Sequence, residues 1–172
     1  MIILLNGPLG IGKSTLGEAL AERIDRCVML DGDRLIALNP PPADEAAYLH
    51  ATIALLVAHH RSSGYTHFVI DHIWRTAGER EDLRDRLLAA DPGADIRTFL
   101  LTLPLEDNLR RIARRQQARA LDEQEFERRT VIEEREALSA VPDGELGERF
   151  DVSAPPSELV TRLLALVGMD ES

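Results

Sequence analysis

The chain has 172 residues, a formal net charge of -10 and a pI near 5.0, and it is long enough for one domain with a sizeable core. Its acidity argues against non-specific nucleic-acid binding and against binding to an anionic membrane surface, because both need basic residues. The single cysteine, Cys27, excludes an intrachain disulfide framework and favours a reducing compartment. Since no signal peptide or membrane span is apparent, we expect a cytoplasmic protein.

The most informative motif lies at the start of the chain. Ile2 to Leu5 form a short apolar run, which predicts a buried strand. The segment 7–14, GPLGIGKS, fits the pattern G-x-x-x-x-G-K-[ST] without a mismatch. Apolar residues then recur at helical spacing, so a helix is expected to begin near Lys13. The motif therefore lies between a strand and a helix N-terminus, where a phosphate-binding loop belongs.

The residue types of this loop suit a bound phosphate chain. Its glycines allow backbone conformations that are closed to residues with a Cβ, so that successive N–H groups can point at an anion. The lysine can reach the β- and γ-phosphates, and the Ser14 hydroxyl can bind Mg²⁺. The loop residues expected to bind a nucleotide are Gly7, Gly10, Ile11, Gly12, Lys13, Ser14 and Thr15.

A second apolar run, 27–30, predicts a strand that ends in Asp31-Gly32-Asp33-Arg34. Carboxylates at the carboxyl end of a strand in a parallel sheet lie in the ligand crevice. One of the two is expected to hold a metal-bound water, and the other to hydrogen-bond or deprotonate a substrate hydroxyl. The alternative is that Asp31 and Asp33 form a turn and cap the next helix.

The segment 35–64 predicts a loop followed by a long helix. Three prolines at 40–42 prevent a continuous helix over 35–43. Asp44 is expected to cap a helix that runs to about Ser62 and is largely buried, because apolar residues cover most of its surface. Its histidines at 50, 59 and 60 are interpreted as core or surface residues and not as metal ligands.

A third strand, 67–71, also ends in a carboxylate. Asp71 occupies the position of the residue that supports Mg²⁺ beside a phosphate-binding loop. His72, Trp74 and Arg75 follow on the same crevice-facing loop. Trp74 can stack on a substrate ring or pack in the core, and both interpretations remain open. Arg75 can bind an acidic group of a substrate or lie in solvent at a helix end.

An arginine-rich helix is expected over 105–120, after a charged helix over 79–90 and a strand over 96–103. Arg111, Arg115 and Arg119 recur at i,i+4 spacing and therefore lie on one face. A basic face near a nucleotide can stabilise the charge on a phosphoryl group in transfer. The alternative is a solvated network of ion pairs with the glutamates of the following helix.

Three more elements are expected after this helix. They are a charged helix over 122–140, a short strand over 149–152 and a last helix capped by Ser157. The apolar stripe predicted for the charged helix consists of Phe126, Val131, Ile132 and Leu138.

This order of motifs resembles the small P-loop kinases: shikimate, gluconate and adenylylsulfate kinases, and the wider nucleoside-monophosphate-kinase-like group. The N-terminal segment 1–7 is also similar to tunicamycin-resistance proteins and chloramphenicol phosphotransferases. The resemblance covers nearly the whole chain, and the positions that carry it are Gly7 to Thr15, Asp31 to Asp33, Asp71, the helix from Arg110 and Asp151 to Ser153.

The resemblance implies a single α/β domain over 1–172. The expected fold is the three-layer α/β/α fold of P-loop NTPases, with a five-stranded parallel sheet and a short helical lid over about 111–122 that covers the nucleotide. ATP and Mg²⁺ are the implied cofactors. Arg111 and Ser153 are expected to bind the nucleotide, Ser153 as part of a base pocket over 152–156.

We therefore expect a phosphotransferase that acts on a hydroxyl of a small molecule, either a metabolite or an antibiotic. The expected catalytic residues are Lys13, Asp33, Arg115 and Arg119, and the expected metal-binding residues are Ser14, Asp31 and Asp71. The acceptor is expected to contact Asp33, Arg34, His72, Trp74 and Arg75.

Two other functions remain open at this point. One is a nucleotide-binding resistance protein that sequesters a drug without phosphorylating it, and the other is an ATPase that drives a partner protein. Neither nucleic acid nor a membrane is an expected partner, and the chain is expected to be a monomer or a homodimer.

Overall fold

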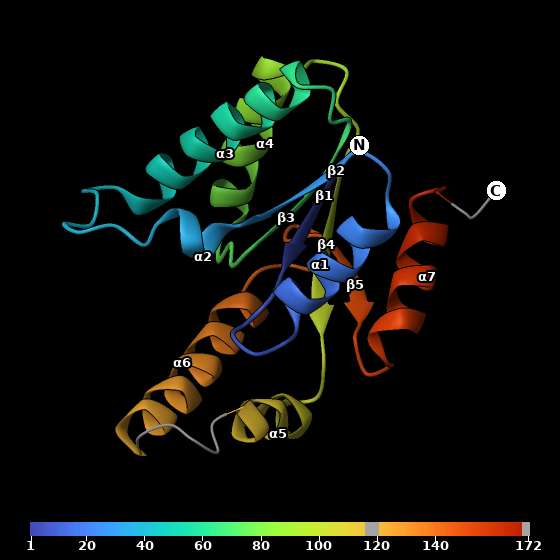
Figure 1. Ribbon diagram of the computed structural model, residues 1–172. Coiled ribbons are helices and arrows are strands. Elements are labelled where there is room, and N and C mark those ends of the chain that lie inside the picture. The colour runs from blue at the N-terminus through green and yellow to red at the C-terminus, as the bar shows by residue number, and fades with distance from the viewer. Residues whose placement is uncertain (116–120, 170–172) are drawn as a thin grey trace.

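A parallel sheet of five strands lies at the centre of the protein, in the order β2-β3-β1-β4-β5 (Figure 1). The structure is a computed structural model that describes residues 1–115 and 121–169. Within these residues the strands are β1 (Ile2–Asn6), β2 (Cys27–Asp31), β3 (His67–His72), β4 (Ile96–Thr102) and β5 (Glu148–Asp151).

Helices cover both faces of this sheet and extend past its carboxyl edge (Figure 1). One face carries α1 (Lys13–Arg23) and α7 (Pro156–Leu166), and the other carries α3 (Glu45–Ser62) and α4 (Ala77–Ala90). The short α2 (Gly32–Leu35) follows β2, while α5 (Leu105–Arg115) and α6 (Leu121–Ser139) lie beyond the strand ends. The predicted α/β/α fold with five parallel strands is thus confirmed.

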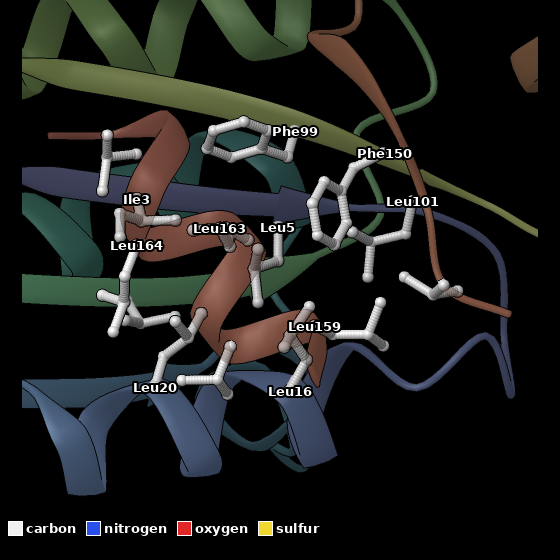
Figure 2. Packing of buried hydrophobic residues seen from close by; sticks show 14 of the residues in the cluster. Ile3, Leu5, Leu16, Leu20, Phe99, Leu101, Phe150, Leu159, Leu163 and Leu164 are labelled. Carbon is white, nitrogen blue, oxygen red and sulfur yellow. The ribbon is translucent and has the colours of Figure 1, made fainter. Parts of the chain in front are cut away.

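Alternation along the strands builds one hydrophobic core on each face. In β1, Ile3 and Leu5 pack toward α1 and α7, where Figure 2 shows them among Leu16, Leu20 and Leu163. The intervening residues of β1, Ile2 and Leu4, pack on the opposite face with residues of α3 and α4. Because successive side chains of a strand point to opposite faces, a sheet buried on both sides needs unbroken apolar runs, as these strands have.

The register brings the functional strand ends together. Asp71 of β3 is level with Asp31 of β2 and Leu5 of β1, and His72 is level with Asn6. Asp71 shares the face of Leu5 and therefore points toward α1, whereas His72 is directed to the side of α3 and α4. The adjacent residues Asp71 and His72 thus lie at the same edge of the sheet but on its two opposite faces.

Several predicted boundaries differ from the structure. The last helix begins at Pro156, and no side chain caps it, so Ser157 lies inside its first turn and not at its cap. In α6, Phe126 is 60 % exposed and Ile132 is 36 % exposed, so neither belongs to a buried stripe. Asp44 does cap α3, accepting a hydrogen bond from the Ala47 N–H.

No helix within residues 1–115 and 121–169 combines the length and apolarity that crossing a membrane requires.

Candidate functional site

The loop between β1 and α1 has the backbone of an anion-binding nest. Gly7, Gly10 and Gly12 have φ values of +153°, +72° and +108°, in the region that side chains disfavour. The Leu16 N–H donates to the Gly12 carbonyl at 3.0 Å, so the first N–H groups of α1 stay available at the loop. The positive end of the α1 dipole adds to the attraction for phosphate.

Lys13 lies folded over this loop. Its Nζ donates to the Gly7 carbonyl oxygen at 2.8 Å and to the Pro8 carbonyl oxygen at 3.3 Å. Burial lowers the pKa of Lys13 below its ordinary value, and the nearby carboxylates of Asp33 and Asp71 oppose that shift. The cation is therefore held where a γ-phosphate would meet it, between the loop and the carboxylates of the strand ends.

Ser14 and Asp71 form the pair that suits Mg²⁺. The Ser14 Oγ donates to Asp71 Oδ2 at 2.7 Å, and Asp71 Oδ1 is buried without a hydrogen-bond partner among the described residues. Burial raises the pKa of Asp71 to about 6. A hydroxyl and an unpartnered carboxylate oxygen are hard oxygen donors, so these two residues fit the metal ion that the fold implies.

Replacing Asp71 with asparagine should stabilise the metal-free protein at pH 8 by about 2 kcal/mol. The folded-state pKa is raised, so ionising Asp71 costs stability as pH rises from about 4 through about 6, and asparagine removes that cost. Urea unfolding in EDTA at pH 4 and pH 8 checks this, with a gain at pH 8 only. Equal stability of the two proteins at pH 8 would contradict a buried charge here.

The Asp33 carboxylate is hydrogen-bonded to His72. The His72 Nδ1 lies 2.9 Å from Asp33 Oδ1, and this hydrogen bond lowers the pKa of Asp33 below its usual value. Asp33 is thus a carboxylate at neutral pH.

A Cβ on Gly32 would lie 2.9 Å from the Asp71 carbonyl oxygen, so only glycine lets the start of α2 approach β3 this closely.

Asp31 has a structural role in the protein as it stands. Its Oδ1 accepts from the Arg34 N–H at 3.2 Å as the N-cap of α2, and its Oδ2 lies 3.2 Å from Arg34 Nε. The capping alternative considered for the Asp-Gly-Asp segment therefore describes Asp31, whereas the Asp33 side chain contacts His72. Arg34 is drawn to Asp31 and is largely exposed.

A cavity of about 360 Å³ opens beside Lys13, and we call it the Trp74 cavity. Its volume lies at the lower end of the range for small-molecule sites. It brings together four of the five residues expected to contact an acceptor, Asp33, His72, Trp74 and Arg75, and Arg34 is not among its lining residues.

Trp74 belongs to the core and to the cavity wall at once. It is 1 % exposed, and its Nε1–H donates to His50 Nε2 at 3.2 Å. The His50 Nδ1 lies 2.7 Å from Asp82 Oδ2. Since Nε2 accepts, the proton of a neutral His50 is on Nδ1 and is donated to Asp82. His50 is therefore a hydrogen-bonded core residue, which is one of the two interpretations that the sequence left open.

Replacing His50 with phenylalanine should lower the free energy of unfolding by about 1–3 kcal/mol, because the buried Trp74 N–H loses its acceptor. His59→Phe, an exposed position on the same helix, is the control and should change it by less than about 0.5 kcal/mol. Urea unfolding followed by the fluorescence of the only tryptophan measures both. Similar small losses in both variants would mean that the Trp74–His50 bond adds nothing.

Two buried polar residues, which belong to none of the sequence motifs, shape the site. Glu134 of α6 is one of the glutamates expected to pair with the arginine-rich helix. It accepts from the Leu9 N–H of the loop at 2.7 Å and from Arg75 Nη2 at 3.1 Å. Asn6 is fully buried, donates to the Trp74 carbonyl oxygen and accepts from the Trp74 N–H, both at 3.0 Å. These bonds fix the loop after β3 against the phosphate-binding loop.

Arg111 joins the loop to the end of β5. Its Nη1 donates to the Ile11 carbonyl oxygen at 2.8 Å and its Nη2 to the Val152 carbonyl oxygen at 2.6 Å. A second cavity of about 490 Å³, which we call the Arg111 cavity, lies between them and is also lined by Thr15 and Ser153. It has the position expected for the base and sugar of a nucleotide bound through the loop.

The arginines expected to close over the γ-phosphate fall where the structure gives no side-chain description. Arg119 lies outside the described residues, and Arg115 ends α5 with its side chain outside them as well. The expected lid over 111–122 contains residues 116–120, which are also outside the described part of the chain.

Comparison with known proteins gives a family match and several solved structures with the same fold. A family model described as an AAA domain, AAA_33, matches residues 2–140. A search of curated proteins finds no match.

Solved structures with the same fold cover nearly the whole chain. A tunicamycin resistance protein from Deinococcus radiodurans is 17% identical with a TM-score of 0.70, covering 98% of this chain and 95% of its own. A gluconokinase from Sinorhizobium meliloti 1021 is 21% identical with a TM-score of 0.68, covering 96% and 90%. An APS kinase from Mycobacterium tuberculosis, in complex with AMPPNP and APS, is 19% identical with a TM-score of 0.62, covering 97% and 96%. At these identities the likeness shows the fold, which is that of the expected kinase group.

Proposed function

The chain belongs to the AAA domain family AAA_33, and from this premise we propose that it is an ATP-dependent phosphotransferase acting on a hydroxyl of a small molecule. The observation that carries the proposal is the position of Lys13. It belongs to the phosphate-binding loop and also lines the Trp74 cavity, together with Asp33. A hydroxyl in that cavity and a γ-phosphate on the loop would therefore meet at one cation.

The chemistry follows from these residues. The acceptor oxygen attacks the γ-phosphorus, the bond from that phosphorus to the bridging oxygen breaks, and ADP leaves. Asp33 accepts the hydroxyl proton and His72 orients its carboxylate. A depressed pKa is compatible with this role, because in a loose transition state the proton moves late. Lys13 and the loop N–H groups stabilise the charge on the phosphoryl oxygens.

The metal would be held by Ser14 and Asp71. When bound, Mg²⁺ neutralises charge on the β- and γ-phosphates. Asp31 is left out of this set in our proposal, since its carboxylate caps α2 and pairs with Arg34.

The second candidate is a resistance protein that binds a drug without modifying it. It is favoured by the structural likeness to a protein described as a tunicamycin resistance protein. The Asp33–His72 pair, which lines the same cavity as Lys13, favours phosphoryl transfer over drug binding without modification. A site that only binds a drug does not need an oriented carboxylate near the position of the γ-phosphate.

Mass spectrometry of hydroxyl compounds incubated with the protein, ATP and Mg²⁺ tests the proposal. The panel should contain sugars, sugar acids, cyclitols, amino sugars and antibiotics, including tunicamycin. We expect one class to gain the mass of a phosphoryl group. A drug that binds but is never modified would favour the second candidate, and ATP loss without a phosphorylated product would favour an ATPase.

A further inference from the structure

The Trp74 cavity contains more negative than positive charge. Its lining carboxylates are Asp33, Glu45, Glu79 and Glu134, and its lining cations are Lys13 and Arg75. The balance decides which acceptors can enter, because a charge brought into a partly buried cavity is screened much less than one on the surface.

Neither cation is free to form an ion pair with a negatively charged group of an acceptor. Lys13 faces the loop carbonyl oxygens and would be occupied by the phosphates of ATP. Arg75 Nη2 lies 3.1 Å from Glu134 Oε1, and Glu134 is fixed in turn by the Leu9 N–H at 2.7 Å. An acceptor carboxylate would therefore have to share the guanidinium with Glu134, whose negative charge repels it.

Two of the carboxylates, Glu45 and Glu79, are not paired with a cationic side chain among the described residues. Glu79 accepts a hydrogen bond from the Arg75 backbone N–H at 2.7 Å, a neutral donor. Glu45 is exposed at the start of α3. Among residues 1–114 and 123–169, no ion pair involves either side chain. Both therefore present negative charge to the contents of the cavity.

Part of the remaining wall is apolar, beside the two histidines His50 and His72. Ile36, Leu49 and Trp74 are among its lining residues, and this surface suits the carbon skeleton of a single ring or a short chain. A ligand that fits both the charged and the apolar lining residues has a compact carbon skeleton. It also has a hydroxyl near Asp33 and a positive group near Glu45 and Glu79.

Resting on the proposed function, we infer that the acceptor is an amino alcohol, a hydroxyl compound whose ammonium group is bound by Glu45 and Glu79. An acceptor with a carboxylate, sulfate or phosphate group is selected against, because the uncompensated glutamates and the ATP phosphates both repel it.

Matched compounds that differ only in charge test this. Glucosamine, glucose and gluconate form one set, and serinol, glycerol and glycerate form another. Each is titrated in the presence of Mg²⁺ and a non-hydrolysable ATP analogue, with the fluorescence of Trp74 as the readout, since it is the only tryptophan and lines the cavity. The ammonium compound of a set should bind at least about tenfold more tightly than the neutral one, and the carboxylate most weakly.

The double variant Glu45→Gln/Glu79→Gln should remove this preference and leave the affinity for the neutral compound within about twofold. Glutamine at 79 keeps an oxygen that can accept from the Arg75 N–H, and Asp44 still caps α3. Glu18→Gln, an exposed position on α1, makes the same kind of change away from the cavity and should keep the preference.

Binding and turnover separate the two claims. Tighter binding of the carboxylates, equal binding of all three charge types, no binding of any, or a preference that survives the double variant would each overturn the inference. Phosphorylation of gluconate or glycerate in preference to the amines would overturn it while the phosphotransferase proposal stands. Selective binding of amines with no phosphorylated product would support the charge selectivity and count against phosphoryl transfer.

Discussion

Replacing Lys13 with alanine is expected to lower kcat/KM for phosphoryl transfer by about 10³-fold and to weaken ATP binding, with the fold intact. The reason is that the Lys13 ammonium is the cation of the phosphate-binding loop and also lines the Trp74 cavity. The other cation that lines this cavity, Arg75, is paired with Glu134. Removing it leaves the γ-phosphoryl charge to backbone N–H groups and the metal.

Calorimetry with ATP and a turnover assay measure this effect, and circular dichroism checks the fold. Arg84→Ala, an exposed position on α4, removes one positive charge away from the site and should behave as the wild type. Because Lys13 is the only lysine, amine acylation mapped by mass spectrometry gives a second readout, in which ATP should protect Lys13 but not the N-terminus. Unchanged ATP affinity together with unchanged turnover would refute the role of Lys13.

Replacing Asp33 with asparagine should lower turnover at saturating substrate by about 10²- to 10⁴-fold, with little change in ATP affinity. Asparagine keeps an oxygen that can accept from His72 Nδ1, so we expect the geometry to be retained while the proposed base is lost. The change therefore acts on the acceptor hydroxyl and not on the bound nucleotide.

Steady-state kinetics with separate titrations of ATP and acceptor distinguish these effects. Asp85→Asn, at an exposed position on α4, is the matched control. If ATP affinity collapses while turnover at saturation is kept, Asp33 serves the metal or the donor, and the assignment of the base is wrong.

Strand periodicity made part of this site predictable. The apolar runs before Asp31 and Asp71 implied parallel strands, and parallel strands end at one edge of the sheet. Counting residues along β3 also assigns Asp71 to the face of α1 and His72 to the opposite face. The phosphate-binding motif then sets Ser14 beside Asp71, where the structure has them hydrogen-bonded.

Long-range polar contacts could not be predicted in this way. Glu134 contacts the loop across 125 residues of sequence, and in a helix rich in glutamate it resembles a surface charge. One signal was available: Val131, Glu134 and Leu138 follow at spacings of three and four, so Glu134 lies on the buried stripe of α6. A charge at such a position requires a partner, and sequence alone does not identify it.

The roles of the paired aspartates were equally beyond local patterns. Asp31 and Asp33 have the same residue type on either side of a glycine, and either could cap α2. Their difference arises because Asp31 lies level with Asp71 in the sheet, while Asp33 meets His72 from the neighbouring strand. Tertiary contacts therefore assign the cap to one and the position beside Lys13 to the other.

Phosphorus-31 NMR of a reaction with the best acceptor tests the central claim most directly. Equimolar ADP and a phosphomonoester of the acceptor should appear together as ATP is consumed, and both should be absent with Asp33→Asn on the same time scale. Release of inorganic phosphate in place of the phosphomonoester, or binding of the acceptor with no loss of ATP, would contradict phosphoryl transfer by this site.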